Sequence, residues 1–229
     1  MIDEINNNYQ KILDRINIAC KKSNRDPTSV KLIAICKRQP ALKINQSINL
    51  GILNFGENRI QDAYNRWSRC SRLEMKGFNL SFVGPLQTNK SENAIKLFDE
   101  IQSLDRIKLA KSLSKSQEKL NRRIKYMIQV NTGKEEQKSG IPPNEVENFI
   151  KTCRNNYGLN ITGLMCIPPV NENPALHFAF MQRFYKRNEL ESLSMGMSND
   201  YDKAIEFGAT HIRLGSALFG SRLEKEEEY

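Results

Sequence analysis

A lysine stands directly after a short apolar run in the first part of the chain. Residues 31–36 read Lys-Leu-Ile-Ala-Ile-Cys, and Lys37 follows them. Burial above an apolar strand removes water from the amine and lowers its pKa, which makes a lysine nucleophilic enough to form a Schiff base with an aldehyde. A lysine whose charged end simply reaches water is the alternative, and position alone favours it because lysine is usually solvated.

Two glycine-containing segments near the other end of the sequence could hold an anion. Residues 194–200 read Ser-Met-Gly-Met-Ser-Asn-Asp, and residues 213–216 read Arg-Leu-Gly-Ser. Glycine lets the backbone approach a ligand, and a serine at the start of a helix offers hydroxyl and N–H donors to a phosphate. Ordinary turn chemistry explains either segment alone, but it explains the two together less well. The candidate anion-binding residues are Ser194, Ser198, Arg213, Gly215 and Ser216.

Short β-prone runs alternate with stretches of helical periodicity after an opening amphipathic helix. The predicted strands cover residues 31–36, 52–55, 80–83, 101–104, 125–130, 161–165, 193–195 and 211–214. Eight strand–helix units in series indicate a single closed (β/α)8 TIM barrel with an additional N-terminal helix. The missing glycine-rich fingerprint after the first strand argues against an open doubly wound sheet. Barrel active sites lie at the carboxyl ends of the strands, so this fold would bring the lysine and both glycine-containing segments together.

A Schiff-base lysine and a phosphate site at one barrel mouth together specify pyridoxal 5′-phosphate (PLP) as the cofactor. The lysine would take the aldehyde, and the helix end would take the phosphate. Arg213 is a fixed fork of donors that can reach either the phosphate or the pyridine nitrogen. Opposite the nitrogen it would keep the ring unprotonated and weaken it as an electron sink. The sequence leaves both contacts open.

Composition points to an ordinary globular protein. The 229 residues are 39% hydrophobic and 27% charged, and the mean hydropathy is −0.58. No apolar run approaches the ~18–20 residues that span a bilayer, and the start lacks a signal sequence, so we expect neither membrane insertion nor secretion. Five cysteines without a Cys-x-x-Cys pair fit the reducing cytoplasm. We expect a barrel over residues 1–222 and an acidic tail over 223–229.

A formal net charge of +9 raises the possibility of a nucleic-acid partner. Part of this charge recurs at helical spacing in one predicted helix, at Lys108, Lys111, Lys115, Lys119 and Arg122. Such a stripe is typical of a solvated helix face, and no aromatic residues interleave it. We therefore expect surface charge and no nucleic-acid binding.

The only two histidines of the chain are expected to be structural. His177 is predicted on a helix surface, and His211 is predicted at the start of the eighth strand, away from the barrel mouth. Two histidines and scattered cysteines are too few for a metal cluster, so we expect no metal site.

Several segments carry a resemblance to a known family. They read IAICKRQP, NFGENRIQDA, FVGPLQTNK, IQSLDRIKLA, QVNTGKEEQKSGI, GLMCIPP and LSMGMSNDYDKAIEFGATHIRLGSALFG. Together these segments, spread over about residues 30–222, resemble the pyridoxal phosphate homeostasis protein family, whose single-domain barrels are similar to the N-terminal domain of alanine racemase. The resemblance implies a cytoplasmic protein that buffers PLP or delivers it to PLP-dependent apo-enzymes, without turnover of its own.

The resemblance also implies roles for individual residues. Lys37 would hold PLP as a Schiff base, and Asn58 would lie beside the cofactor. The phosphate or ring would be bound by Arg213, Gly215 and Ser216, together with Ser194 or Ser198. Lys138 matches a family lysine implicated in cofactor handling, although an ordinary exposed loop lysine is equally consistent with its position.

The sequence departs from the family at four positions near the site. The family usually has serine before the Schiff-base lysine and threonine after it, where this chain has Cys36 and Arg38. It usually has histidine where Ser81 and Pro85 stand. The lysine itself is retained, so the departures affect the surroundings of the cofactor rather than its binding.

An amino-acid racemase is the alternative function. Racemisation needs a second base on the face of the substrate opposite Lys37. In alanine racemases that base is a tyrosine from a C-terminal β-domain of the partner subunit, and this chain ends after its eighth strand–helix unit. Tyr64 or Tyr126 could replace that base only by an accident of geometry. We therefore expect a PLP-binding monomer, because racemase dimers depend in part on the domain that is missing here.

Overall fold

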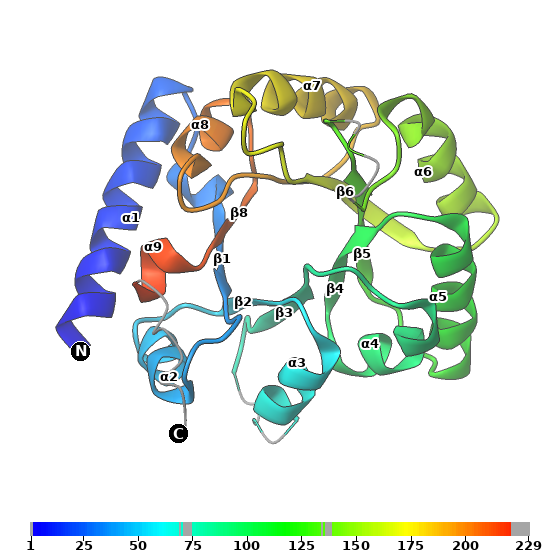
Figure 1. The fold of residues 1–229 in the computed structure, drawn as a ribbon, viewed down its shortest axis with the longest axis horizontal. Coiled ribbons are helices and arrows are strands. Elements are labelled where there is room, and N and C mark those ends of the chain that lie inside the picture. The colour runs from blue at the N-terminus through cyan, green and yellow to red at the C-terminus, as the bar shows by residue number, and fades with distance from the viewer. Residues whose placement is uncertain (1, 69, 71–74, 134, 136–138, 221–229) are drawn as a thin grey trace.

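Within the described residues, eight parallel strands close into a barrel in which each strand pairs with the next and β8 returns to β1 (Figure 1). The computed structural model describes residues 2–68, 70, 75–133, 135 and 139–220. The strands are β1 Lys31–Ile35, β2 Asn54–Glu57, β3 Asn79–Phe82, β4 Glu100–Leu104, β5 Lys125–Val130, β6 Asn160–Cys166, β7 Ser192–Ser194 and β8 His211–Leu214. The predicted (β/α)8 barrel is confirmed.

Helices form the outer layer of the barrel (Figure 1). They are α1 Ile2–Lys22, α2 Ala41–Asn49, α3 Ile60–Trp67, α4 Ser91–Leu97, α5 Ile107–Lys119, α6 Val146–Asn155, α7 Pro174–Arg187, α8 Tyr201–Glu206 and α9 Ser216–Phe219, with short 3-10 helices at Pro27–Ser29, Thr88–Lys90 and Pro143–Glu145. No described helix is both long and apolar enough to cross a membrane.

The opening helix completes the outer layer. The last helix, α9, has only 4 residues, and α1 packs against α9, α8 and α2. Ile5, Ile12 and Ile16 of α1 are buried in these contacts, which is the amphipathic pattern expected from their spacing. The N-terminal helix therefore covers the side of the barrel that a single helical turn leaves open.

Two local expectations are wrong. The second strand begins at Asn54 rather than at Ile52, because the Ile52 amide donates to the Ser47 carbonyl at the end of α2. His177 is not on the helix surface but is 7% exposed, and its Nε2 lies 3.1 Å from Oε2 of Glu172. This contact with a residue before α7 has no counterpart in the local sequence pattern.

The basic face of α5 is as expected, whereas the expectation for the C-terminal tail is not tested. On α5, the side chains of Lys108, Lys111 and Lys115 are exposed while Leu109 and Leu113 are buried, as predicted for a solvated basic face. The predicted acidic tail, 223–229, lies outside the described residues. The division into a barrel over 1–222 and a tail stays a prediction.

Packing between β2 and α3 positions the loop that carries Asn58. The rings of Phe55 and Trp67 lie with centroids 5.1 Å apart. The fully buried carboxylate of Glu57 accepts a hydrogen bond from Nε1 of Trp67 at 3.0 Å and pairs with Arg66. Burial raises the pKa of Glu57, and the Arg66 charge opposes this rise. A buried ion pair of this kind fixes α3 against the end of the strand.

The buried side chain of His211 makes the free energy of unfolding depend on pH. It is 7% exposed at the first position of β8, and burial lowers its pKa to about 3, with further lowering from the charges of Lys31, Lys125 and Arg213. An unfolded histidine titrates near pH ~6.5, so as the pH falls below this value the unfolded chain binds a proton that the folded chain does not. This group therefore weakens folding as the pH falls from about 6.5 toward 3.

We predict that His211→Asn flattens the loss of stability at acid pH. The free energy of unfolding should fall less steeply between about pH 6.5 and 4, by up to about 1.4 kcal/mol per pH unit relative to the wild type. Urea unfolding at several pH values measures this slope. A variant with the wild-type slope would show that His211 does not contribute to it.

Candidate cofactor-binding site

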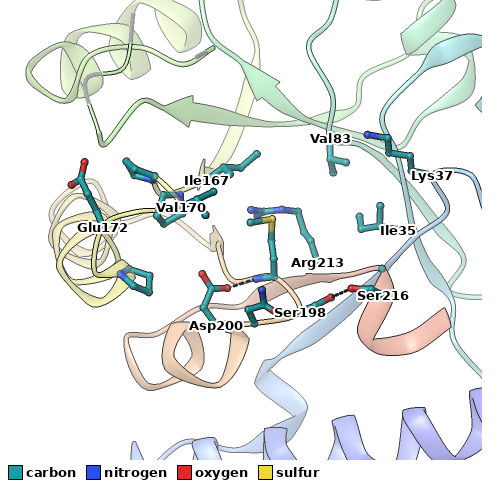
Figure 2. A pocket seen from close by; sticks show the side chains of 16 residues that line it. Ile35, Lys37, Val83, Ile167, Val170, Glu172, Ser198, Asp200, Arg213 and Ser216 are labelled. Atoms are coloured by element: carbon teal, nitrogen blue, oxygen red, sulfur yellow. Dashed lines mark hydrogen bonds between the residues drawn. The ribbon is translucent and has the colours of Figure 1, made fainter. Parts of the chain in front are cut away.

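A cavity of about 600 Å³ opens at the carboxyl ends of the strands. Its walls come from five places in the chain: the end of β1, Val83 after β3, the segment 167–174 after β6, the segment 197–200 after β7, and the junction of β8 with α9. Figure 2 shows Lys37 and Glu172 at opposite ends of the cavity, with Arg213 between them. The barrel thus brings three of the predicted segments to one cavity.

Lys37 lines the cavity from the turn after β1. The turn is held by backbone bonds from the Cys36 amide to the Gly56 carbonyl, at 3.0 Å, and from the Gln39 amide to the Cys36 carbonyl, also at 3.0 Å. The side chain is half-buried, and no described residue forms a hydrogen bond or ion pair with its ammonium group. A backbone fixed in this way leaves the amine at the cavity wall and available to a ligand.

The two unusual neighbours of Lys37 do not enter the cavity lining. Arg38 is exposed and has φ 56, in the left-handed region. Cys36 is fully buried, and burial raises the pKa of its thiol well above the usual range. The added cation therefore faces solvent, and the added thiol stays protonated beneath the turn.

Arg213 is the buried cation of the cavity. It is 5% exposed, and its two terminal nitrogens donate to Oγ of Ser194 at 2.6 Å and to the carbonyl of Cys166 at 2.8 Å. Burial lowers the pKa of Arg213, yet a guanidinium keeps its charge in proteins. Ser194 is fully buried behind the guanidinium and does not line the cavity. Its position is that of a support for Arg213.

Two serine hydroxyls meet where β8 joins α9. Oγ of Ser216 donates to Oγ of Ser198 at 3.1 Å, and Oγ of Ser198 also accepts the Ala217 amide at 3.2 Å (Figure 2). Gly215 lies beside them, and a Cβ there would meet nothing closer than 3.8 Å. The carboxylate of Asp200 accepts the Met197 amide at 2.7 Å and so holds the segment that carries Ser198. These groups form a cluster of hydroxyl and N–H donors at the cavity wall.

Asn58 is not among the described residues that line this cavity. Asn58 is half-buried in the loop after β2, and its buried Oδ1 has no hydrogen-bond partner among the described residues. A Cβ at Gly84 would come within 2.2 Å of the Asn58 carbonyl oxygen, so glycine is required there for the loop to pass. Lys138 lies outside the described residues.

Sequence reasoning missed several residues that line the cavity. Ile167, Val170 and Glu172 line it from the segment after β6, and Asp200 lines it from the segment after β7. Burial raises the pKa of Asp200, and the nearby charge of Arg213 opposes this rise. The pair of prolines at 168 and 169, shortly after the predicted strand 161–165, was the available signal, because such a pair stiffens a loop.

Taken together, the donors along the cavity suit a small anionic ligand that carries a carbonyl group. An unpaired primary amine can react with a carbonyl, and a buried guanidinium attracts negative charge. Hydroxyl and backbone N–H groups bind phosphate oxygens without adding charge. The chemistry of this donor set fits PLP.

Known proteins of similar sequence agree with PLP as the ligand of this cavity. Residues 5–223 match the family described as alanine racemase, N-terminal domain. The chain is 35% identical to the pyridoxal phosphate homeostasis protein of Haemophilus influenzae over 230 residues, which cover 95% of this chain and 96% of that protein. It is 31% identical to the protein of the same name from Escherichia coli K12 over 231 residues, or 96% of this chain and 98% of that one. This chain belongs to the pyridoxal phosphate homeostasis protein family.

Solved structures place the family's barrel beside that of alanine racemase. The structure of PipY from Synechococcus elongatus with PLP bound has a TM-score of 0.75 at 32% identity and covers 91% of this chain and 100% of that chain. Alanine racemase of Clostridium difficile has a TM-score of 0.71 at 12% identity and covers 99% of this chain and 59% of that chain. The second likeness shows a shared fold alone, and it confirms the predicted similarity to the racemase barrel.

Gly196 fixes the segment between β7 and α8 that carries Ser198. Its φ is +92, and a Cβ there would lie 2.6 Å from Cβ of Ala204 and 2.9 Å from Cα of Tyr201. Gly51 has a similar φ of +84, but a Cβ there would meet nothing within 4 Å. The two glycines therefore form a matched pair that separates backbone strain from steric overlap.

We predict that Gly196→Ala destabilises the protein more than Gly51→Ala does. Gly51→Ala should cost about 1–2 kcal/mol, because only the left-handed backbone resists the side chain. Gly196→Ala should cost about 1–3 kcal/mol more, because α8 must also move. Thermal or urea unfolding of both variants measures the difference, and equal losses would contradict the steric argument.

Proposed function

We propose that this protein binds PLP in the cavity at the carboxyl ends of its strands and acts in PLP homeostasis, by buffering the cofactor or delivering it. One observation carries the proposal: a lysine with no partner among the described residues, a buried arginine and a serine pair surround a single cavity. The names of the relatives and the PLP-bound structure of PipY support it.

Each side chain has a role that follows from its position. PLP supplies an aldehyde that captures a primary amine and a phosphate that accepts hydrogen bonds. We assign the aldehyde to Lys37, whose nitrogen replaces the aldehyde oxygen as water leaves. The donors of Ser198, Gly215 and Ser216 bind the phosphate, and Arg213 holds a positive charge against the anionic cofactor.

Three residues singled out in the sequence have less direct roles in this proposal than the residues that line the cavity. Ser194 acts on the cofactor through Arg213, because its hydroxyl accepts from the guanidinium and lies behind it. The family resemblance implies that Asn58 lies beside the cofactor; it does not line the described cavity, but its buried Oδ1 has no partner among the described residues. Lys138 keeps the role in cofactor handling that the resemblance implies.

Binding without turnover is the second part of the proposal. A racemase needs a base opposite its lysine, and the described lining of the cavity contains no tyrosine. Tyr64 is 58% exposed on α3, outside this lining. The hydroxyl of Tyr126 is buried beside Oε1 of Gln117 at 3.3 Å, and burial raises its pKa above the usual range. Neither tyrosine is placed to exchange a proton at the cavity.

The location and partners of the protein are inferred from its exposed charges and its cysteines. Five free cysteines suit the reducing cytoplasm, where we place it. The exposed lysines of α5 suit a solvated surface rather than a nucleic-acid site. We infer a monomer whose recipients are PLP-dependent apo-enzymes.

We predict that borohydride reduction of the PLP-loaded protein fixes the cofactor on Lys37. Peptide mass mapping should find the label on this residue, and Lys37→Ala should lose both the label and the visible absorption band of the bound cofactor. Lys108→Ala removes an exposed lysine on α5 and should behave as the wild type does. The absence of a label, or a label on a different lysine alone, would overturn the assignment.

We also predict that the PLP-loaded protein does not racemise L-alanine. Chiral chromatography after long incubation should find no more D-alanine than free PLP produces at the same concentration. D-alanine formed at an enzymatic rate, and abolished by Lys37→Ala, would instead establish the racemase alternative.

A further inference from the structure

A row of buried hydrogen bonds runs through the interior of the barrel from the wall of the cavity. Arg213 donates to Oγ of Ser194 at 2.6 Å, and this hydroxyl donates to Oε1 of Gln102 at 2.7 Å. Nε2 of Gln102 donates to Oε2 of Glu100 at 2.6 Å, and Oγ of Ser81 donates to the same oxygen at 3.0 Å. All five side chains are at most 5% exposed, so water does not compete for these bonds.

The direction of every bond in this row is set by its two ends. An arginine can only donate, and an ionised carboxylate can only accept. The Gln102 amide nitrogen therefore faces Glu100, and its oxygen faces Ser194. The single proton of the Ser194 hydroxyl then goes to Gln102, which leaves a lone pair for Arg213. Arg213 and Glu100 thus form a charge pair that acts through two neutral side chains.

The charge of Glu100 is supported at its own end of the row. Burial raises the pKa of Glu100, but the hydrogen bonds from Gln102 and Ser81 oppose this rise. The charges of Lys31 and Lys125 at the start of β1 and β5 oppose it as well. These four groups favour the ionised form that the direction of the row requires.

Apolar packing alone does not account for this row. TIM-barrel interiors are usually filled by bulky branched residues, and buried polar groups destabilise a protein when a partner is lost. Of the five residues in the row, Arg213 alone lines the cavity. Its other terminal nitrogen is already held by the Cys166 carbonyl at 2.8 Å. The contact that the row controls is therefore the one between Ser194 and Arg213.

We propose that Gln102 and Glu100 are positioning residues for the cofactor site: they orient the Ser194 hydroxyl so that it accepts from Arg213 and holds the guanidinium in one place against the bound cofactor. This inference rests on the proposed binding of PLP in this cavity. Neither residue touches the cofactor, and both act through Arg213.

The test uses Gln102→Leu, which keeps the bulk of the side chain and removes both hydrogen bonds. Titration of the apo-protein with PLP, followed by absorbance, should give a dissociation constant about tenfold higher than that of the wild type, a change of about 1.4 kcal/mol. The absorption maximum of the bound cofactor should also move, because the nearest fixed charge has shifted. Ser194→Ala should do the same, and Ser194→Thr, which keeps the hydroxyl, should restore both values.

Three further variants make the result specific. Combining Gln102→Leu with Ser194→Ala should raise the dissociation constant by less than the product of the two single effects, because both residues belong to one row. Glu100→Gln keeps the shape but lets the neighbouring amide turn, so it should move the absorption maximum with a smaller, about threefold, loss of affinity.

Ser103→Ala is the matched control: this next residue of β4 is 1% exposed, and its hydroxyl has no partner in the described structure. It should leave the affinity and spectrum unchanged.

The outcomes separate this inference from the proposed function. A wild-type protein that binds no PLP would overturn the function itself. A wild-type protein that binds PLP, with Gln102→Leu altering only the melting temperature as Ser103→Ala does, would overturn the positioning role. If Gln102→Leu does not fold, Glu100→Gln decides, and an unchanged affinity and spectrum in that variant would reject the inference.

Discussion

The pairing of β1 with β8 is the constraint on which the site depends. These strands come from opposite ends of the chain and pair in register from Lys31 with His211 to Ala34 with Leu214. The register sets Arg213 beside Ile33, so the carboxyl ends of the first and last strands emerge together. The amine that follows β1 and the donors that follow β8 therefore reach one cavity only because the barrel closes. In an open sheet these two strands could lie at opposite edges.

A second constraint follows from placing a guanidinium in the barrel wall. Desolvation of a charge costs several kcal/mol unless hydrogen bonds replace the lost water. Here the replacements are the Cys166 carbonyl and the Ser194 hydroxyl, and the second of these is supported from β4 across the barrel. A cation held in this way needs little reorganisation when an anion binds, because its partners are already in place. The polar interior is thus the structural condition for a fixed positive charge at the cavity.

Much of the fold could be predicted because its signals are local. Compact apolar runs mark buried parallel strands, and their count distinguishes a barrel from an open sheet. Lys37, Gly215 and Ser216 were within reach of sequence reasoning because each follows a strand directly, where barrel sites lie. The start of β2 was misplaced by two residues because a bond to the end of α2, invisible in the sequence, delays the pairing. Burial of His177 was missed for the same reason, since it depends on how the preceding loop folds.

The unpredicted part of the site consists of partners that lie far apart in the chain. Ser194 was identified as a candidate from its serine- and glycine-rich surroundings, but its contacts with Gln102 and Arg213 depend on strand stagger that a sequence does not reveal. Glu100 and Gln102 carried a signal that was available: two polar side chains two positions apart, with Gln102 inside the predicted strand 101–104 and Glu100 directly before it. Residues two positions apart in a strand share a face, so such a pair on the inner face of a barrel implies polar partners on other strands.

The architecture of the site also bears on how a protein could hold a cofactor and still release it. An amine with no ion-pair partner among the described residues can capture an aldehyde and release it again as water returns. The described groups around the cavity include no tyrosine that can act as a second base. Ser216 is exposed at the mouth, while Arg213 is buried at the back. In the proposed site, the contacts to an anion would therefore range from an exposed serine hydroxyl, which water can replace, to a buried fixed charge. Release of a bound anion would then begin at the exposed end, where water replaces the serine, before the buried arginine loses its contact.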